Sequence, residues 1–111
     1  MAIQQWNEDT LVVRLDDDPA LSDDMGETRE RTGGGCCDIV LDLSDLTLLT
    51  SSGLAKLLRL RKRQVESERR LILCCPQDAV WGVFLATGLD TLFVFAPTVS
   101  EALAGIQGGK A

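Results

Sequence analysis

Residues 38 to 60 read "DIVLDLSDLTLLTSSGLAKLLRL" and join two elements of different periodicity. The run Asp38–Leu43 is almost continuously apolar and is bounded by acids, which is typical of a central strand covered on both faces. From about residue 52 to residue 67, apolar residues recur at helical spacing with charged residues between them, which predicts an amphipathic helix. A cluster of hydroxyl side chains followed by Gly53 stands at the junction of the two elements.

Two further strands are predicted before this unit. "TLVVRL", residues 10–15, is rich in β-branched residues and is followed by the turn-forming "DDDPA". An earlier strand at residues 3–6 can pair with it as a hairpin across residues 7–9. Residues 20–35 carry a weaker pattern, for which we expect a short helix and then a flexible loop at Gly33–Gly35.

The C-terminal half continues the alternation of strand and helix. The predicted elements are a strand at residues 70–75, a helix that Gly88 ends, a strand at residues 92–96, and a short last helix opened by the T-x-x-E capping box of Thr98 and Glu101. Alternation of this kind over residues 38–107 implies right-handed crossovers between parallel strands. We therefore predict an α/β fold with a mixed, mainly parallel sheet of four to five strands.

Length and composition suit one compact domain. The chain has 111 residues, of which 45% are hydrophobic and 25% are charged, so we expect a single domain over residues 1–111. The first ten residues, "MAIQQWNEDT", lack the basic head and apolar run of a secretory signal. No later stretch approaches the roughly 20 apolar residues that span a bilayer. We expect a cytoplasmic protein without a membrane partner.

Charge is distributed unevenly around a formal net charge of −6. Acids dominate residues 1–45, whereas bases are concentrated between residues 56 and 70. Such a basic run can contact nucleic acid, but it more often forms a solvated helix face, and the acidic remainder would repel a phosphate backbone. Nucleic acid is therefore the less favoured partner.

The four cysteines form two adjacent pairs, Cys36–Cys37 and Cys74–Cys75. Neither pair has the CxxC spacing of a zinc site, and the chain contains no histidine to complete a mixed site. Neighbouring residues on a strand point to opposite faces, so one thiol of a pair would be buried while the other faced elsewhere. We predict free thiols, no metal and no cofactor.

The composition also argues against catalysis. Without histidine, a Ser-His-Asp or Cys-His arrangement cannot be assembled. The glycine-rich "TGGGCC" at residues 32–37 lacks the lysine of a phosphate-binding loop and precedes a strand instead of following one. We therefore predict a binding protein, not an enzyme.

The hydroxyl cluster consists of Thr50, Ser51 and Ser52. Ser51 or Ser52 can cap the helix by accepting a hydrogen bond from an unpaired amide of its first turn. A cap explains one hydroxyl and leaves two more beside Gly53, whose missing side chain lets another backbone approach closely. The junction is therefore a candidate protein-binding surface.

Together with "LILCCPQDAVWGVFLATGLDTLF" at residues 71–93, the opening stretch resembles the STAS domain of bacterial anti-sigma-factor antagonists. The resemblance extends from about residue 38 to residue 104. The family's D-S-[ST]-G-[LI] signature corresponds to Thr50-Ser51-Ser52-Gly53-Leu54, in which Thr50 replaces the aspartate. A proline after a later strand and a closing Gly-Leu correspond to Pro76 and Gly88-Leu89.

The resemblance implies a mixed sheet with helices packed on one side. It also implies a switch, in which the unmodified domain binds an anti-sigma factor that is itself a serine kinase. That kinase would phosphorylate the hydroxyl directly before the glycine, which is Ser52, and so release itself. The implied contact surface is Thr50, Ser51, Ser52, Gly53 and Leu54.

Several alternatives stay open. Ser51 and Thr50 are the next candidates for the phosphate acceptor. Because Thr50 replaces the acid, the domain could instead be a non-phosphorylated scaffold in a larger signalling assembly. A nucleic-acid or anionic-surface binder acting through the basic helix 56–70 is a weaker possibility.

Three aromatic side chains fit either a core or a partner surface. Helical and strand spacing favour the core for Phe84 and Phe93. Trp81 lies off the cleanest apolar stripe, so both partial exposure and a role in association stay open for it.

Overall fold

The computed structural model of the chain describes residues 3–17, 26, 28 and 37–108. The short helix expected within residues 20–35 and the loop at Gly33–Gly35 lie almost entirely outside the described residues. In that segment only Gly26 and Thr28 are described; both are helical, and Thr28 is buried. In the described ranges, no helix combines the length and the apolar character needed to cross a bilayer.

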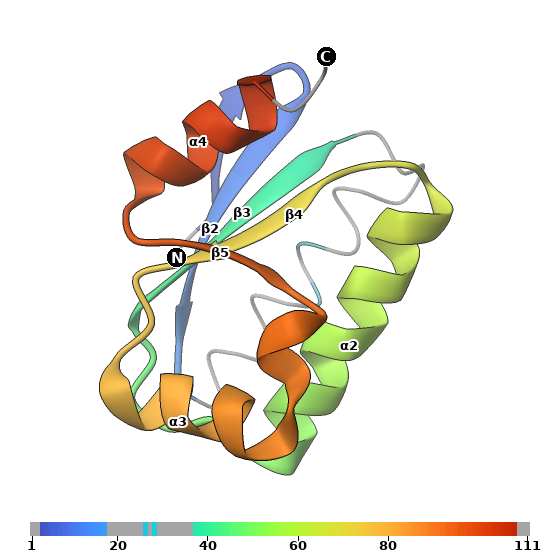
Figure 1. Cartoon of the computed structure of the whole chain (residues 1–111). Helices are drawn as coiled ribbons and strands as arrows, with labels where there is room; N and C mark the ends of the chain where they lie inside the picture. Colours follow the sequence, from blue (N-terminus) through green and yellow to red (C-terminus); the bar gives the residue numbers. More distant parts are fainter. Residues whose placement is uncertain (1–2, 18–25, 27, 29–36, 109–111) are drawn as a thin grey trace.

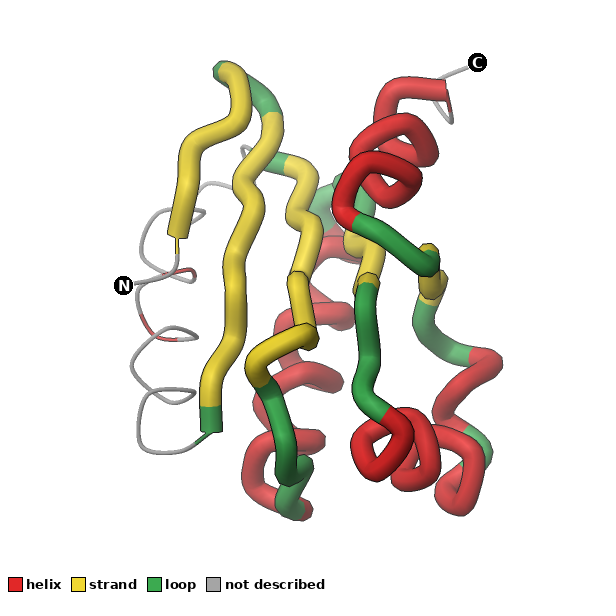
Figure 2. The backbone as a smooth tube through the Cα atoms, turned by 90° about the vertical axis from the view of Figure 1, so that its left-hand side faces the viewer, coloured by secondary structure: helices red, strands yellow, loops and turns green. Residues whose placement is uncertain are grey.

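The described residues form a five-stranded sheet in the order β1-β2-β3-β4-β5 (Figures 1 and 2). The strands are β1 (Ile3–Asn7), β2 (Thr10–Asp16), β3 (Asp38–Asp45), β4 (Leu71–Cys74) and β5 (Val94–Ala96). β1 is antiparallel to β2, and the other neighbouring pairs are parallel. The predicted α/β fold with a mixed, mainly parallel sheet is confirmed. So is the N-terminal hairpin, in which Asn7 lies opposite Thr10.

The helices begin and end close to the predicted signals. They are α2 (Ser51–Glu66), α3 (Asp78–Thr87), a 3-10 turn (Leu89–Thr91) and α4 (Val99–Gly108). Gly88 ends α3 in the left-handed conformation, with φ 74°, which a glycine adopts without steric cost. Thr98 Oγ1 accepts a hydrogen bond from the amide of Glu101 at 3.1 Å, as expected for the opening of α4.

The larger core lies between the sheet and the helices α2 and α3, which cover the same face (Figure 1). Its members include Leu11, Val13, Ile39, Leu41 and Leu73 from the strands and Leu57, Leu60, Val80 and Phe84 from the helices. Full burial of each such side chain contributes about 1.5–3 kcal/mol. This core fixes α2, and with it the hydroxyl cluster, against the carboxyl ends of the strands.

α4 packs on the opposite face of the sheet, which corrects the expectation that the helices lie on one side (Figure 1). Its Ala102, Leu103 and Ile106 pack with the alternate strand positions, among them Val12 and Val40. Since successive strand residues face opposite ways, a strand with an unbroken apolar run needs a cover on each side. α4 provides the second cover.

Candidate functional site

The segment from β3 to α2 crosses the carboxyl edge of the sheet and carries the hydroxyl cluster. Leu46 and Leu49 are buried in the larger core and anchor this segment. Leu48 between them is 66% exposed. The chain therefore presents an apolar side chain to solvent two residues before Thr50.

Thr50 is the N-cap of α2, which corrects the prediction that Ser51 or Ser52 would cap the helix. Its backbone is extended, with φ −85° and ψ 166°, and its Oγ1 accepts from the amide of Gly53 at 3.1 Å. Threonine replaces the family's aspartate here, and both residue types make this cap. Because Thr50 serves as the cap, both serine hydroxyls are left for other contacts.

Ser51 and Ser52 are the first two residues of α2 and are exposed. Ser52 Oγ accepts a hydrogen bond from Lys56 Nζ at 2.8 Å, one helical turn further along. Gly53 is buried and Leu54 is half-buried against the larger core. Of the five residues expected to form the contact surface, Thr50, Ser51 and Ser52 are exposed, whereas the following two belong mainly to the fold.

Asp17 is a residue of this site that sequence reasoning missed. Its carboxylate, just after β2, accepts from the amides of Thr47 and Leu48 at 2.8 and 3.1 Å and from the Thr47 hydroxyl. The hydrogen bond from the Thr47 hydroxyl is the main reason why the pKa of Asp17 is lowered. The acidic run after β2 was the available signal, since neighbouring parallel strands end at the same edge.

Gln77 ties a second loop to this edge. Its Nε2 donates to the carbonyl oxygen of Ser44 at 2.7 Å and so joins the entrance of α3 to the end of β3. With Asp17, it holds in place the segment that leads from β3 to the hydroxyl cluster. The exposed hydroxyls therefore stand on an anchored backbone.

Thr50→Ala is expected to lower the free energy of unfolding by about 1 kcal/mol, because the amide of Gly53 loses its acceptor. Thr50→Asp should keep or slightly raise the parent stability, since aspartate caps at least as well as threonine. Urea unfolding followed by circular dichroism measures both changes. Equal stability of the parent and the Thr50→Ala protein would contradict the capping role.

The three aromatic side chains differ in burial. Phe84 and Phe93 are 0% and 6% exposed and meet edge to face, with ring centroids 5.5 Å apart. Trp81 is half-buried and stacks edge to face on Phe95 at 4.9 Å. The prediction of core positions for Phe84 and Phe93 is confirmed. The exposure of Trp81, which the sequence left open, is partial, and its role in association stays open.

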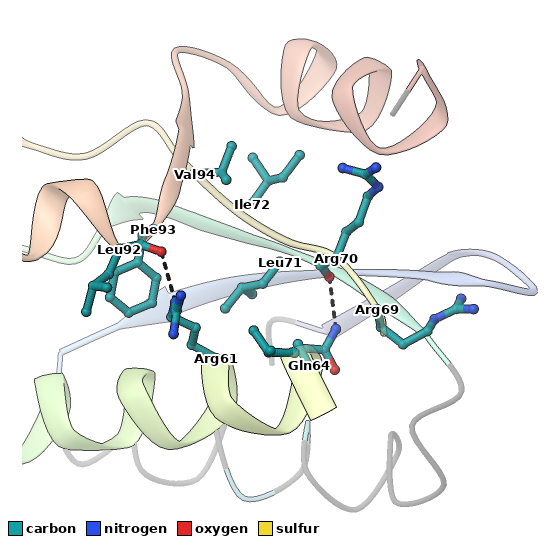
Figure 3. Close-up of a pocket in the computed structure, with 10 residues that line it drawn as sticks. Arg61, Gln64, Arg69, Arg70, Leu71, Ile72, Leu92, Phe93 and Val94 are labelled. Carbon is teal, nitrogen blue, oxygen red and sulfur yellow. Dashed lines mark hydrogen bonds between the residues drawn. The ribbon is translucent and has the colours of Figure 1, made fainter. Parts of the chain in front are cut away.

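The basic half of α2 and the start of β4 border a cavity of about 210 Å³ beside β5 (Figure 3). Here Arg61 Nε donates to the carbonyl of Leu92 at 2.9 Å, and the buried Gln64 donates to the carbonyl of Arg70 at 2.9 Å (Figure 3). Arg69 Nε lies 3.4 Å from Asp38 Oδ1. Basic side chains here contact the chain's own carbonyls and acids, which favours a structural role over nucleic-acid binding.

Taken together, a mixed sheet and helices on both faces define a small α/β protein with exposed hydroxyls at the entrance of α2, at the carboxyl edge of the sheet. The sequence matches the family model of the STAS domain over residues 3–102. The chain belongs to the STAS domain family, as the motifs around Ser52 indicated. No curated protein matches the sequence.

Solved structures of the same fold include anti-sigma-factor antagonists. SpoIIAA in its unphosphorylated form has a TM-score of 0.81 and 24% identity, over 96% of this chain and 95% of that chain. The phosphorylated form of SpoIIAA from Bacillus has a TM-score of 0.73 and 23% identity, over 92% and 95%. A serine-to-glutamate variant of RsbS from Moorella thermoacetica has a TM-score of 0.80 and 16% identity, over the full length of both chains (100% of each).

Proposed function

We propose that this chain is an anti-sigma-factor antagonist. As a non-enzymatic, cytoplasmic, single STAS domain, it binds an anti-sigma factor while Ser52 is unmodified. The anti-sigma factor is a serine kinase, and phosphorylation of Ser52 releases it. The observation that carries this proposal is the position of Ser52, an exposed hydroxyl in the first turn of α2 that is not used as the helix cap.

The folded chain tolerates a phosphate at Ser52. A phosphoserine carries about −1.5 to −2 charges, and a helix N-terminus favours anions because its amides and dipole point toward them. Lys56 already donates to Ser52 Oγ at 2.8 Å, so its ammonium group stands within reach of a phosphate on that oxygen. Modification should therefore leave the STAS fold intact.

The interface with a partner would not tolerate the phosphate. A surface that fits a neutral hydroxyl must either desolvate the new charge or supply a cation, and a partner built for the unmodified state does neither. The nearby Leu48, 66% exposed, offers apolar contact area that only a close approach would bury. A charge at Ser52 would therefore also remove the close contact in which a partner buries Leu48.

The relatives in structure fit this proposal. One of them, SpoIIAA, is described as an anti-sigma factor antagonist in its unphosphorylated form and has also been solved in its phosphorylated form. The RsbS structure carries a glutamate in place of a serine. Proteins of this fold therefore exist in states that differ by one acidic group.

Incubation of the chain with its cognate anti-sigma kinase and ATP should add one phosphate, mapped by mass spectrometry to the peptide that contains Ser52. Ser52→Ala should abolish the addition, whereas Ser51→Ala should retain it. Both side chains are exposed, so neither change threatens the fold. Undiminished phosphorylation of Ser52→Ala would remove the site assignment.

A second candidate is favoured by Thr50, which replaces the family's acidic residue. A kinase that needs this acid would leave Ser52 unmodified, and the chain would then act as a permanent scaffold in a larger assembly. In that case the kinase assay adds no phosphate to the parent chain, while the two proteins still bind.

A further inference from the structure

Three groups able to bind a metal meet on the α4 face of the sheet. Asp42 of β3 and Cys74 of β4 are register partners, and Cys75 follows directly. One carboxylate oxygen and the two sulfur atoms all lie within 4.8 Å of one another. Asp42 and Cys74 are buried and Cys75 is half-buried. The cluster lies away from the hydroxyl cluster's helix α2, which covers the other face.

The backbone of Cys75 explains why the two thiols meet. Adjacent strand residues normally point to opposite faces, and the sequence predicted this arrangement for the pair. Cys75 instead has φ 57°, a left-handed conformation that is uncommon and strained for a residue with a side chain. It packs with Cys74 against the α4-side core. A turn alone would be made more easily by glycine; here the left-handed residue is a cysteine, and its sulfur lies within 4.8 Å of the Cys74 sulfur.

The ligand set suits a thiophilic divalent cation. Zinc is bound by thiolate sulfur at about 2.3 Å and by carboxylate oxygen at about 2.0–2.2 Å, so ligand atoms of a tetrahedral site stand roughly 3.3–3.8 Å apart. The observed spread of up to 4.8 Å closes to this range with side-chain shifts of about 1 Å. Three protein ligands would leave one position open to water.

Neighbouring groups orient Asp42 and offset part of the negative charge. The amide of Ser44 donates to Asp42 Oδ1 at 3.0 Å, and Arg14 Nε lies 3.5 Å from Asp42 Oδ2. Two thiolates and a carboxylate exceed the charge of a divalent cation by one, and Arg14, which Asp42 shares with a second acid, offsets part of this excess. The second acid is Asp45, whose Oδ2 lies 3.8 Å from Arg14 Nε. Partners of this kind fix the geometry of metal-binding carboxylates.

Asp42 is the member of the cluster that borders a solvent-filled depression. The depression has a volume of about 590 Å³ and lies between the sheet and the start of α4. Its lining includes Asp42, Arg14, Asp16, Asp45 and Val99. An ion in this depression meets the Asp42 carboxylate first; the two cysteines do not line the depression, and their sulfur atoms lie within 4.8 Å of a carboxylate oxygen of Asp42. We propose that Asp42, Cys74 and Cys75 bind a thiophilic divalent cation of the Zn²⁺ class, with both thiols releasing their protons to solvent. This site is independent of the phosphorylation of Ser52.

The test uses the full chain, kept reduced with a phosphine, and Zn²⁺ in native mass spectrometry and equilibrium dialysis. One ion per chain is expected. Loss of a second-shell partner typically costs 10–100-fold in affinity, so loss of a ligand in Cys75→Ser or Asp42→Asn should cost about 100-fold or more. Cd²⁺ should give a thiolate charge-transfer absorption with the parent chain, which disappears in Cys75→Ser.

The other cysteine pair provides the control. A Cys36→Ser/Cys37→Ala chain keeps the proposed ligands and should bind Zn²⁺ like the parent. Circular dichroism establishes that each variant is folded. Of the three proposed ligands, Cys75 is the only half-buried one, so its substitution disturbs the packing least. Absence of stoichiometric Zn²⁺ binding, or undiminished binding by Cys75→Ser, would overturn the proposal.

Discussion

Ser52→Asp is expected to weaken binding of the anti-sigma factor by about 100-fold or more. An uncompensated charge buried at an interface costs about 3–5 kcal/mol, and each 1.4 kcal/mol is about tenfold in affinity. The same substitution should not destabilise the free chain, because an acid in the first turn of a helix contributes about 0.3–1 kcal/mol of stability. Lys56, which donates to Ser52 Oγ, can pair with the new carboxylate. Affinity and stability should therefore change in opposite directions.

Isothermal titration calorimetry with the purified anti-sigma factor measures the affinity, and thermal melts measure the stability. Ser100 supplies the matched control, since it is the second residue of α4, as Ser52 is the second residue of α2. Ser100→Asp adds the same charge at the same helix position on the other face of the sheet and should bind like the parent. Equal affinity of Ser52→Asp and the parent would favour the scaffold function instead.

The fold could be predicted where a single physical constraint dominates. The unbroken apolar run of β3 requires burial on both faces, and Gly88 provides the left-handed residue that ends α3. The face covered by α4 could not be predicted in this way. Its apolar stripe fits either face of a sheet that is apolar on both, so the path of the chain after β5 decides the outcome.

The sequence predicted which residues lie at the candidate site better than it predicted their arrangement. The exposed position of Ser52 follows from its place at the start of an amphipathic helix. Serine and threonine both cap helices, and serine slightly better, so the sequence did not show that Thr50 would be the cap. Asp17 contacts residues 30 positions later in the chain. The positive φ of Cys75 depends on tertiary contacts, and spacing rules for metal ligands assume regular strands.

Phe84→Ala is expected to destabilise the chain by about 3–5 kcal/mol, because the site is fully buried and a cavity would remain. Phe84 meets Phe93 and Phe95 edge to face at centroid distances of 5.5 and 5.0 Å, and these contacts would also be lost. For a chain of this size the melting temperature should fall by roughly 10–20 °C. Denaturant unfolding gives the free energy directly.

Leu85→Ala is the matched control, since the neighbouring side chain is 52% exposed and its removal should change the stability by less than about 0.5 kcal/mol. A loss below 1 kcal/mol in Phe84→Ala would contradict its position at the centre of the larger core. Below its melting temperature, the folded Phe84→Ala chain should still bind the anti-sigma factor, because Phe84 presents no surface to a partner. Stability and binding are thus separable: a core substitution removes folded protein, whereas a charge at Ser52 removes affinity from protein that remains folded.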